Sequence, residues 1–413
     1  MMGDILFLAH RIPYPPNRGD KIRSFNILKR LCQLGTVHVA TFADDDEDLG
    51  HADMLRPMLG SVHIEKRAVS KPVGAAKAIL SGKPISLTLF DSAGIRKFVA
   101  NITTQKPIDA VFVFSGQMAQ FVPEDLTGSR FIMDFGDVDS AKFASYARSS
   151  SWPMRHVHAR EAVKLAAFEK AVAHRADCST FVTEAEAALF RAETGLDAER
   201  VRALENGIDC RFFDPRADFA RIEKPEGSLV IFTGQMDYRP NIEAVVSFAD
   251  DVLPVVRQQN PHVNFAIVGR NPTGEVQRLA SREGVIVTGG VDDIRSWLAA
   301  ADIVAAPLRM ARGIQNKVLE AMAMARPVVA SVPAYEGIDA ERGRHLMVAD
   351  TIADEAHLIL ELLANPAKAD MMGCAARDRM LERYVWDQTL APLGRLIGRE
   401  PVELRQKALT EAS

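Results

Sequence analysis

Short apolar runs alternate with helical patterns along the whole chain, and this alternation constrains the fold more than any other feature. Most runs are apolar on both faces, as in central parallel strands covered by helices. They lie at residues 4–9, 36–42, 109–114, 130–134 and 178–183, and again at 228–234, 263–269, 284–289, 302–307 and 327–331. Helical patterns lie between them, at residues 24–34, 160–175 and 292–301. Two successive sets of strand–helix alternation predict two doubly wound α/β domains.

A polar, proline-bearing stretch at residues 209–228 separates the two sets of strands. The 413 residues also exceed what one ordinary core holds. We therefore expect an N-terminal domain over residues 1–210 and a C-terminal domain over residues 211–385. Ligands of doubly wound sheets bind beyond the carboxyl ends of the strands, so two facing domains would place a ligand in the cleft between them.

Composition excludes several classes of protein. The formal net charge of −4 argues against a chain that binds nucleic acid as a whole. The four cysteines are scattered, with neither metal-ligand nor redox spacing. No stretch approaches the ~18 uncharged apolar residues of a membrane span, and the first apolar run is too short for an export signal. No G-x-G-x-x-G occurs, which argues against a standard dinucleotide site. We expect a cytoplasmic protein.

The segment GIQNKVLEAMAMARPVVAS, residues 313–331, places charges at the start of an otherwise apolar helix. Asn316 is a good N-cap residue, and the helix must end before Pro327. Gly313 lets the preceding backbone approach a ligand closely. The free N–H groups of a helix start bind anions, and Lys317 adds a full positive charge there. The segment therefore predicts a phosphate or diphosphate site.

Glu320, three residues after Lys317, would repel a diphosphate and so needs another partner. The hydroxyls of a ribose attached to the phosphates would donate hydrogen bonds to a carboxylate here, as they do in dinucleotide folds. The plain alternative is that Glu320 only stabilises the helix dipole, by ~0.5 kcal/mol, while Lys317 is solvated. These residues alone leave both interpretations open.

The chain from Asp302 to Ser331 resembles the nucleotide-sugar site of family 4 retaining glycosyltransferases, which have the GT-B fold. Further motifs agree in order, namely ENGID (205–209), FTGQMDYRPNIEAVVSF (232–248), AIVGRNP (266–272) and RYVWDQTL (383–390). The resemblance implies two Rossmann-like domains facing a cleft, with a C-terminal helix over residues 386–413 that crosses back to the N-terminal domain. HRIPYPPNRGDKIRSFNIL (10–28) and DFGDVDSAKF (134–143) are most similar to sugar transferases of PEP-CTERM/exosortase systems, which are linked to exopolysaccharide assembly.

The resemblance also implies which residues bind the donor, a UDP- or GDP-linked sugar held without cofactor or metal. These residues are Gly19, Gly234, Gly269, Gly313, Asn316, Lys317 and Glu320. Lys317 and Arg239 are expected to hold the departing diphosphate during catalysis. Asp134 is expected to contact the acceptor or the transferred sugar.

Four positions depart from the family pattern. Arg312 stands where the family usually has a first Glu, and Arg18 replaces the first glycine of a pair that ends at Gly19. Gln235 and Pro240 stand where the family usually has basic residues. We expect Arg239 and Lys317 to take over the contacts of the missing basic residues.

The expected function is retaining transfer of a sugar from a nucleotide diphosphate sugar to a lipid-linked glycan, in exopolysaccharide or cell-surface glycan synthesis. Arg312 prompts an alternative, a non-catalytic sugar-nucleotide-binding partner of a polysaccharide assembly system. A sugar-nucleotide epimerase of similar two-domain shape is a third interpretation. Asp137 and Asp139 spell the D-x-D by which a different glycosyltransferase fold holds Mn²⁺, but the two-domain pattern argues for the metal-independent fold.

Residues 142–175 form a basic segment, which contains seven Lys and Arg residues but only two acidic residues, Glu161 and Glu169. Trp152 lies within the segment. A basic surface with an aromatic residue suits anionic lipid headgroups, so we expect a peripheral position on the inner face of the plasma membrane. The alternative is an ordinary solvated face.

Overall fold

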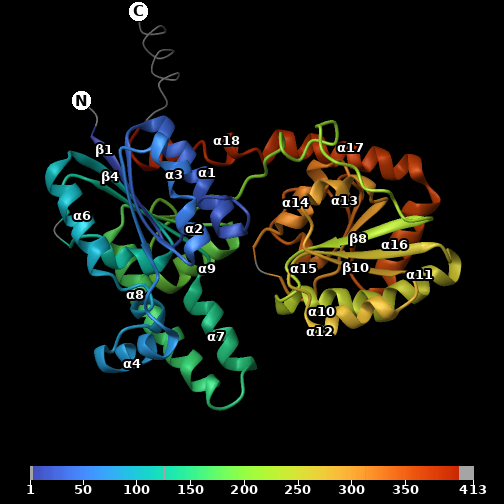
Figure 1. Cartoon of the computed structure of the whole chain (residues 1–413), viewed down its shortest axis with the longest axis horizontal. Helices are drawn as coiled ribbons and strands as arrows, with labels where there is room; N and C mark the ends of the chain where they lie inside the picture. The colour runs from blue at the N-terminus through green and yellow to red at the C-terminus, as the bar shows by residue number, and fades with distance from the viewer. Residues whose placement is uncertain (1–2, 125, 312, 400–413) are drawn as a thin grey trace, which may run out of the picture. The chain divides into compact units, whose positions relative to one another are not determined.

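The computed structural model describes residues 3–124, 126–311 and 313–399, and the chain divides into two compact units. The first unit consists of Met1–Glu205 together with the chain from Leu390 onward, and the second is Asn206–Thr389. Each unit contains one parallel sheet (Figure 1). The prediction of two doubly wound α/β domains is confirmed.

The first unit has a seven-stranded sheet in the order β3-β2-β1-β4-β5-β6-β7. Its strands are β1 (Asp4–Ala9), β2 (Val37–Ala43), β3 (Ser61–Lys66), β4 (Ile108–Phe114), β5 (Arg130–Gly136), β6 (Cys178–Phe181) and β7 (Val201–Ala203). Its helices are α1 (Gly19–Leu34), α2 (Asp46–Gly50), α3 (Ala52–Leu55), α4 (Lys71–Ser81), α5 (Ile85–Thr88), α6 (Ala93–Gln105), α7 (Asp139–Ser149), α8 (Met154–Arg175), α9 (Glu184–Thr194) and α19 (Leu393–Leu396), with 3₁₀ turns η1 (Arg56–Met58) and η2 (Gly116–Phe121). The strand order reverses between β1 and β4, which makes their carboxyl ends the switch point of this sheet.

The second unit has a six-stranded sheet in the order β10-β9-β8-β11-β12-β13, with helices on both faces (Figure 1). Its strands are β8 (Ser228–Thr233), β9 (Val263–Val268), β10 (Val285–Gly289), β11 (Ile303–Ala306), β12 (Val328–Ser331) and β13 (Met347–Ala349). Its helices are α10 (Arg239–Ser247), α11 (Leu253–Gln259), α12 (Gly274–Arg278), α13 (Ile294–Ala300), α14 (Asn316–Ala323), α15 (Val332–Tyr335), α16 (Ile352–Ala364), α17 (Pro366–Arg383) and α18 (Trp386–Thr389), with a π turn η3 (Phe248–Val252) and a 3₁₀ turn η4 (Leu279–Ser281). Here the switch point lies between β8 and β11.

All ten strands expected from the sequence are present, but three strands were missed. These three, β3, β7 and β13, lie at sheet edges. The alternating sequence SVHIEK of β3 leaves its side chains half-buried, and β7 and β13 are three residues long. Edge strands are commonly short or polar, because long apolar edges would pair with other chains. They therefore carry little of the apolar signal that marks the central strands.

The chain after Arg383 differs from the single helix expected over residues 386–413. Its described part contains two short helices, α18 and α19, separated by Leu390–Pro392. The second of them packs against α1 in the first unit. Residues 400–413 lie outside the described residues. No helix in the described part of the chain is long and apolar enough to cross a membrane.

Arg399 fixes the last described part of the chain to the first unit. Its side chain is almost fully buried and donates to the backbone oxygens of Leu34, at 3.0 Å, and Gly3. It also pairs with the carboxylate of Asp109. One side chain thereby joins the end of α1, the start of β1 and the start of β4.

We expect the substitution Arg399→Met to lower the free energy of unfolding of the first unit by about 3 kcal/mol, because it leaves buried carbonyls and a carboxylate without their donor. Urea unfolding followed by circular dichroism measures this loss. The matched control is Arg395→Met, at an exposed position of α19, which should change stability by less than about 0.5 kcal/mol. Equal effects of the two substitutions would contradict the proposed role of Arg399.

Candidate functional site

The expected site in the second unit lies at the carboxyl ends of its central strands, where the loops after β8 and β9 touch. Gly234 follows β8 and Gly269 follows β9. A Cβ atom added to Gly269 would lie 1.6 Å from the Gly234 oxygen, so only glycine permits this approach. The Gly234 N–H donates to the Val268 oxygen at 3.0 Å and holds the two loops together. Both glycines named from the sequence thus lie where the turns after two neighbouring strands touch, a place called the Gly234–Gly269 turn below.

Lys317 reaches this turn from the first turn of α14, which follows β11. Its Nζ donates to Oδ1 of Asn241 at 2.6 Å and lies 4.4 Å from the centroid of the Phe232 ring. A Cβ atom added to Gly234 would lie 3.4 Å from this Nζ and 2.7 Å from Nδ2 of Asn241. The ammonium group is therefore packed between a glycine backbone, an aromatic ring and a neutral amide.

Asn241 is a part of the site that sequence analysis missed. It is almost fully buried in α10, and its Nδ2 donates to the Gln235 oxygen at 2.8 Å while its Oδ1 accepts from Lys317. The amide can therefore rotate little. No local pattern marks it, because its partner Lys317 lies 76 residues later in the sequence.

Lys317 and Glu320 are half-buried, and burial shifts the pKa of each side chain in the direction that favours its uncharged form. Burial lowers the pKa of Lys317 to about 7, against the opposing charge of Glu320. Burial likewise raises the pKa of Glu320 to about 7, against the opposing charge of Lys317. Near neutral pH, small changes in the surroundings can therefore change the protonation states of both side chains. An arriving anion would favour the protonated form of Lys317.

Asn316 differs from its predicted role. The N-cap residue of α14 is Gln315, no side chain caps this helix, and Asn316 is the first helical residue. Its Oδ1 is buried and has no hydrogen-bond partner within the described ranges. Buried oxygens are normally paired, so this one can accept a hydrogen bond from a bound molecule. Gly313, in the preceding loop, has φ 68°, a left-handed conformation that favours glycine. Arg312 lies outside the described residues.

Within the described residues, Arg239 pairs with two carboxylates outside the Gly234–Gly269 turn. Its guanidinium is largely exposed and pairs with Glu243, at 2.7 Å, and with Glu275, at 3.5 Å. Exposed pairs of this kind are weak, so a phosphate could replace either partner. A contact between Arg239 and a diphosphate stays a prediction.

The side chain of Asp134 lies in the interior of the first unit. It is fully buried, and Arg23 donates to its two carboxylate oxygens at 2.9 and 3.0 Å. The Gly136 N–H also donates to it, at 3.2 Å. In this conformation both oxygens of Asp134 are bonded inside the unit, and a direct contact with a sugar stays a prediction. Its side chain anchors Arg23 and the end of β5.

Gly19 is the first residue of α1, at the switch point of the first sheet. Arg18 precedes it in an extended conformation, and the Arg18 Nε lies 2.7 Å from Asp20. His10, at the end of β1, has Nε2 within 2.8 Å of the Arg11 guanidinium and 3.3 Å of Asp20. Burial lowers the pKa of His10. A donor contact of Gly19 stays a prediction.

The basic segment 142–175 covers α7, α8 and the turn between them. Trp152 is 80% exposed in this turn. Arg160 and Arg175, however, donate to backbone oxygens of neighbouring segments, Arg160 to Ala78 and Arg175 to Pro123. These two guanidinium groups hold the fold together, which leaves fewer basic groups for a partner than the sequence count implies. The described part of the chain contains no group of three or more His, Cys, Asp or Glu residues that could hold a metal ion.

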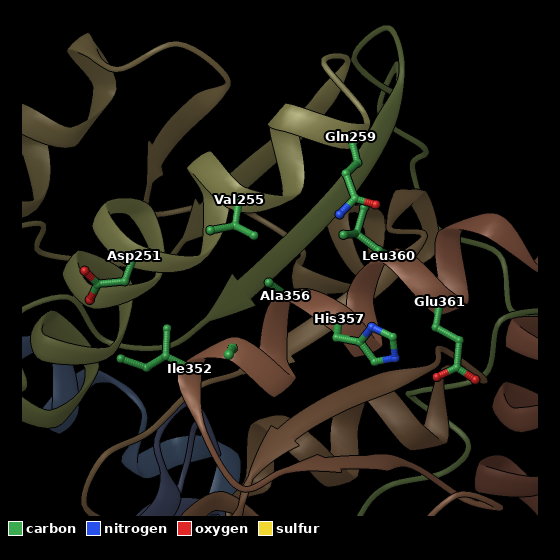
Figure 2. Close-up of a pocket in the computed structure, with 9 residues that line it drawn as sticks. Asp251, Val255, Gln259, Ile352, Ala356, His357, Leu360 and Glu361 are labelled. Atoms are coloured by element: carbon green, nitrogen blue, oxygen red, sulfur yellow. The ribbon is translucent and has the colours of Figure 1, made fainter.

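A separate groove of about 600 Å³ lies on the second unit between α11 and α16. Figure 2 shows Val255 and Gln259 of α11 opposite Leu360 and His357 of α16. None of its lining residues is one of the expected site residues. The groove is therefore distinct from the site formed by Lys317 and the Gly234–Gly269 turn.

We expect Lys317→Met to stabilise the ligand-free protein by about 1 kcal/mol below pH 7, because the buried ammonium is removed. The folded pKa is about 7 and the unfolded value is 10.5, so the unfolded state binds more protons between them. Wild-type stability from this group therefore rises with pH across that window, and the advantage of the variant should shrink. Thermal unfolding at several pH values measures this. A constant difference, or the same trend for exposed Lys170→Met, would contradict it.

The part of the chain that matches a known protein family lies in the second unit, which contains the site described above. Residues 227–365 match the family described as glycosyl transferases group 1. The GDP-mannose-dependent alpha-(1-6)-phosphatidylinositol monomannoside mannosyltransferase of Mycolicibacterium smegmatis is 30% identical over 247 residues, which are 55% of this chain and 63% of that protein. The chain thus spans less than two thirds of the length of this curated relative.

Solved structures resemble the whole chain. Sucrose-phosphate synthase from Thermosynechococcus elongatus has a TM-score of 0.69 at 17% identity and covers 100% of both chains. HepE of Anabaena, solved in complex with UDP-glucose, has a TM-score of 0.63 at 15% identity over 95% of this chain and 99% of its own. At these identities the likeness shows the fold alone. The chain therefore has the two-domain GT-B fold, and its second unit contains the segment that matches the group 1 glycosyltransferases.

Proposed function

We propose that this chain is a retaining glycosyltransferase that moves a sugar from a nucleotide diphosphate sugar to a glycan acceptor. The observation that carries the proposal is the ammonium of Lys317, held beside the Gly234–Gly269 turn by the neutral amide of Asn241. The match of residues 227–365 to the group 1 glycosyltransferases supports it. The relative that depends on GDP-mannose and the neighbour solved with UDP-glucose support a nucleotide sugar as donor.

In the proposed reaction the bond between the sugar and the donor diphosphate breaks, and a bond to the acceptor oxygen forms on the same face. The departing diphosphate oxygen takes the acceptor proton, so no separate protein base is required. Lys317 stabilises the negative charge that grows on the leaving group, and its partly dry position strengthens that effect. The diphosphate would compete with Asn241 for the ammonium protons. Arg239 is the second cation proposed to meet the diphosphate.

Glu320 is proposed to accept hydrogen bonds from the two ribose hydroxyls of the donor. It lies one helical turn after Lys317 on α14, so a single nucleotide could contact both side chains. Asn316, with its unpaired buried Oδ1, supplies a further acceptor in the same turn. The site uses no metal or cofactor in this proposal. Its nucleotide is UDP or GDP.

The acceptor is proposed to be a lipid-linked glycan of exopolysaccharide or cell-surface synthesis, of the kind handled by PEP-CTERM-associated transferases. The protein would then act on the inner face of the plasma membrane. The exposed Trp152 and the basic groups of α7 and α8 that are not bound to backbone oxygens support this placement. Residues such as Arg155 and Lys164 are exposed and available to lipid phosphates.

We expect Glu320→Gln and Lys317→Ala to impair the enzyme differently. Loss of a charge-assisted hydrogen bond to ribose should weaken donor binding about 10- to 100-fold with little change in kcat. Loss of Lys317 should lower kcat as well as affinity, because its charge matters most in the transition state. Steady-state kinetics with a panel of UDP- and GDP-sugars measures both. Binding without turnover on any acceptor would favour a non-catalytic binder.

A pH series and a modified donor sharpen this test. Because the pKa of Glu320 is raised to about 7, the difference between wild type and Glu320→Gln should widen as pH rises through that value. A 2′,3′-dideoxyribose analogue should bind wild type poorly and should be nearly indifferent to Glu320→Gln. If this analogue binds wild type as well as the parent nucleotide does, Glu320 is not a ribose ligand.

A further inference from the structure

Helix α4 turns large apolar side chains to solvent and small residues inward. Ile79 and Leu80 are 72% and 89% exposed, and Val73 is also exposed. Ala78 is fully buried, and a Cβ atom added to Gly74 would lie 2.5 Å from Cδ2 of Leu89. A helix on the surface of a globular protein normally has the opposite arrangement. The outward face of α4 therefore has no apolar partner among the residues that the structure describes.

Hydrogen bonds from α8 hold α4 against the rest of the first unit. Arg160 of α8 donates to the oxygens of Ala78, at 2.8 Å, and Lys83, at 3.1 Å. Glu161 accepts from the Ile85 N–H at 2.7 Å, just beyond the end of α4. Figure 1 shows α4 next to α8. These contacts hold Ile79 and Leu80 outward on a rigid base.

The charge around this face is positive. From Lys66 to Phe90 the sequence has five Lys and Arg residues and no Asp or Glu, and from Ser140 to Arg160 it again has no Asp or Glu. A pocket of about 350 Å³ opens beside Leu80 and is lined by Lys77 and Lys83. The pocket also contains Ser81, Thr88, Gln120 and Asp91, and the Asp91 carboxylate is paired with Arg96. Two lysines beside an exposed leucine suit a phosphate attached to an apolar chain.

We propose that α4 lies in the interface of an anionic phospholipid bilayer, with Ile79 and Leu80 among the acyl chains and Lys77 and Lys83 at the lipid phosphates. Exposed apolar side chains flanked by lysines bind such interfaces through apolar burial and electrostatic attraction together. Ile79 and Leu80 are exposed within the stretch from Lys66 to Phe90, which has lysines and no Asp or Glu, and this charge favours an anionic bilayer as the partner. This inference deepens the membrane contact proposed above and does not depend on sugar transfer.

The test is cosedimentation with vesicles of phosphatidylglycerol and phosphatidylcholine at low salt, without nucleotide. The double substitution Ile79→Ser and Leu80→Ser should weaken binding at least about tenfold, because most of the buried apolar area is lost. Lys77→Ser with Lys83→Ser should weaken binding to these vesicles and leave the weak binding to pure phosphatidylcholine unchanged. Both pairs are exposed, so thermal unfolding should not change.

The matched control is Met54→Ser with Met371→Ser, which removes two apolar side chains that are 60% and 68% exposed elsewhere. The control should bind vesicles as wild type does. The proposal is overturned if wild type ignores the anionic vesicles, if the Ile79/Leu80 variant binds them equally well, or if that variant only dissociates an oligomer. Nucleotide binding, measured in parallel, should survive in every α4 variant. A wild type that binds vesicles through α4 but binds no nucleotide would refute the transferase and not this inference.

Discussion

The hydrogen bond from Lys317 to Asn241 is the interaction on which the candidate site depends. Burying an ammonium group costs free energy, and a carboxylate partner would normally offset that cost. Here the bonded partner is a neutral amide at 2.6 Å, with the Phe232 ring 4.4 Å away. A neutral partner orients the cation without cancelling its charge. An anion that reaches the Gly234–Gly269 turn would therefore favour the protonated form of Lys317 and bind to it.

The same region shows why a ligand-binding site costs stability. Burial shifts the pKa of Lys317 and of Glu320 toward neutrality, and the buried Oδ1 of Asn316 has no partner in the described structure. Each of these features is unfavourable in the free protein. A nucleotide diphosphate, with acidic oxygens and ribose hydroxyls, would satisfy all of them at once. These features fit the donor proposed above, which has both negative charge and hydrogen-bond donors.

The sequence predicted the central strands because their apolar runs report burial on both faces, and it placed Gly234, Gly269 and Lys317 at the sheet end where they meet. It missed Asn241, because the contact with Lys317 spans 76 residues and leaves no local pattern. For a similar reason it did not show what surrounds Asp134. An acidic residue at a strand end suggests a binding site, but Arg23, 111 residues earlier, occupies its carboxylate. Only the structure reveals that α4 exposes its large apolar side chains, since its sequence does not show which face packs inward.

A crystal structure of the protein with UDP or GDP tests the central claim most directly. The account predicts a diphosphate oxygen about 2.7–2.9 Å from Nζ of Lys317, as in charge-assisted hydrogen bonds, beside the backbone of Gly234. The ribose hydroxyls should lie within hydrogen-bond distance of the Glu320 carboxylate. A nucleotide bound elsewhere, with Lys317 still bonded only to Asn241, would contradict the account.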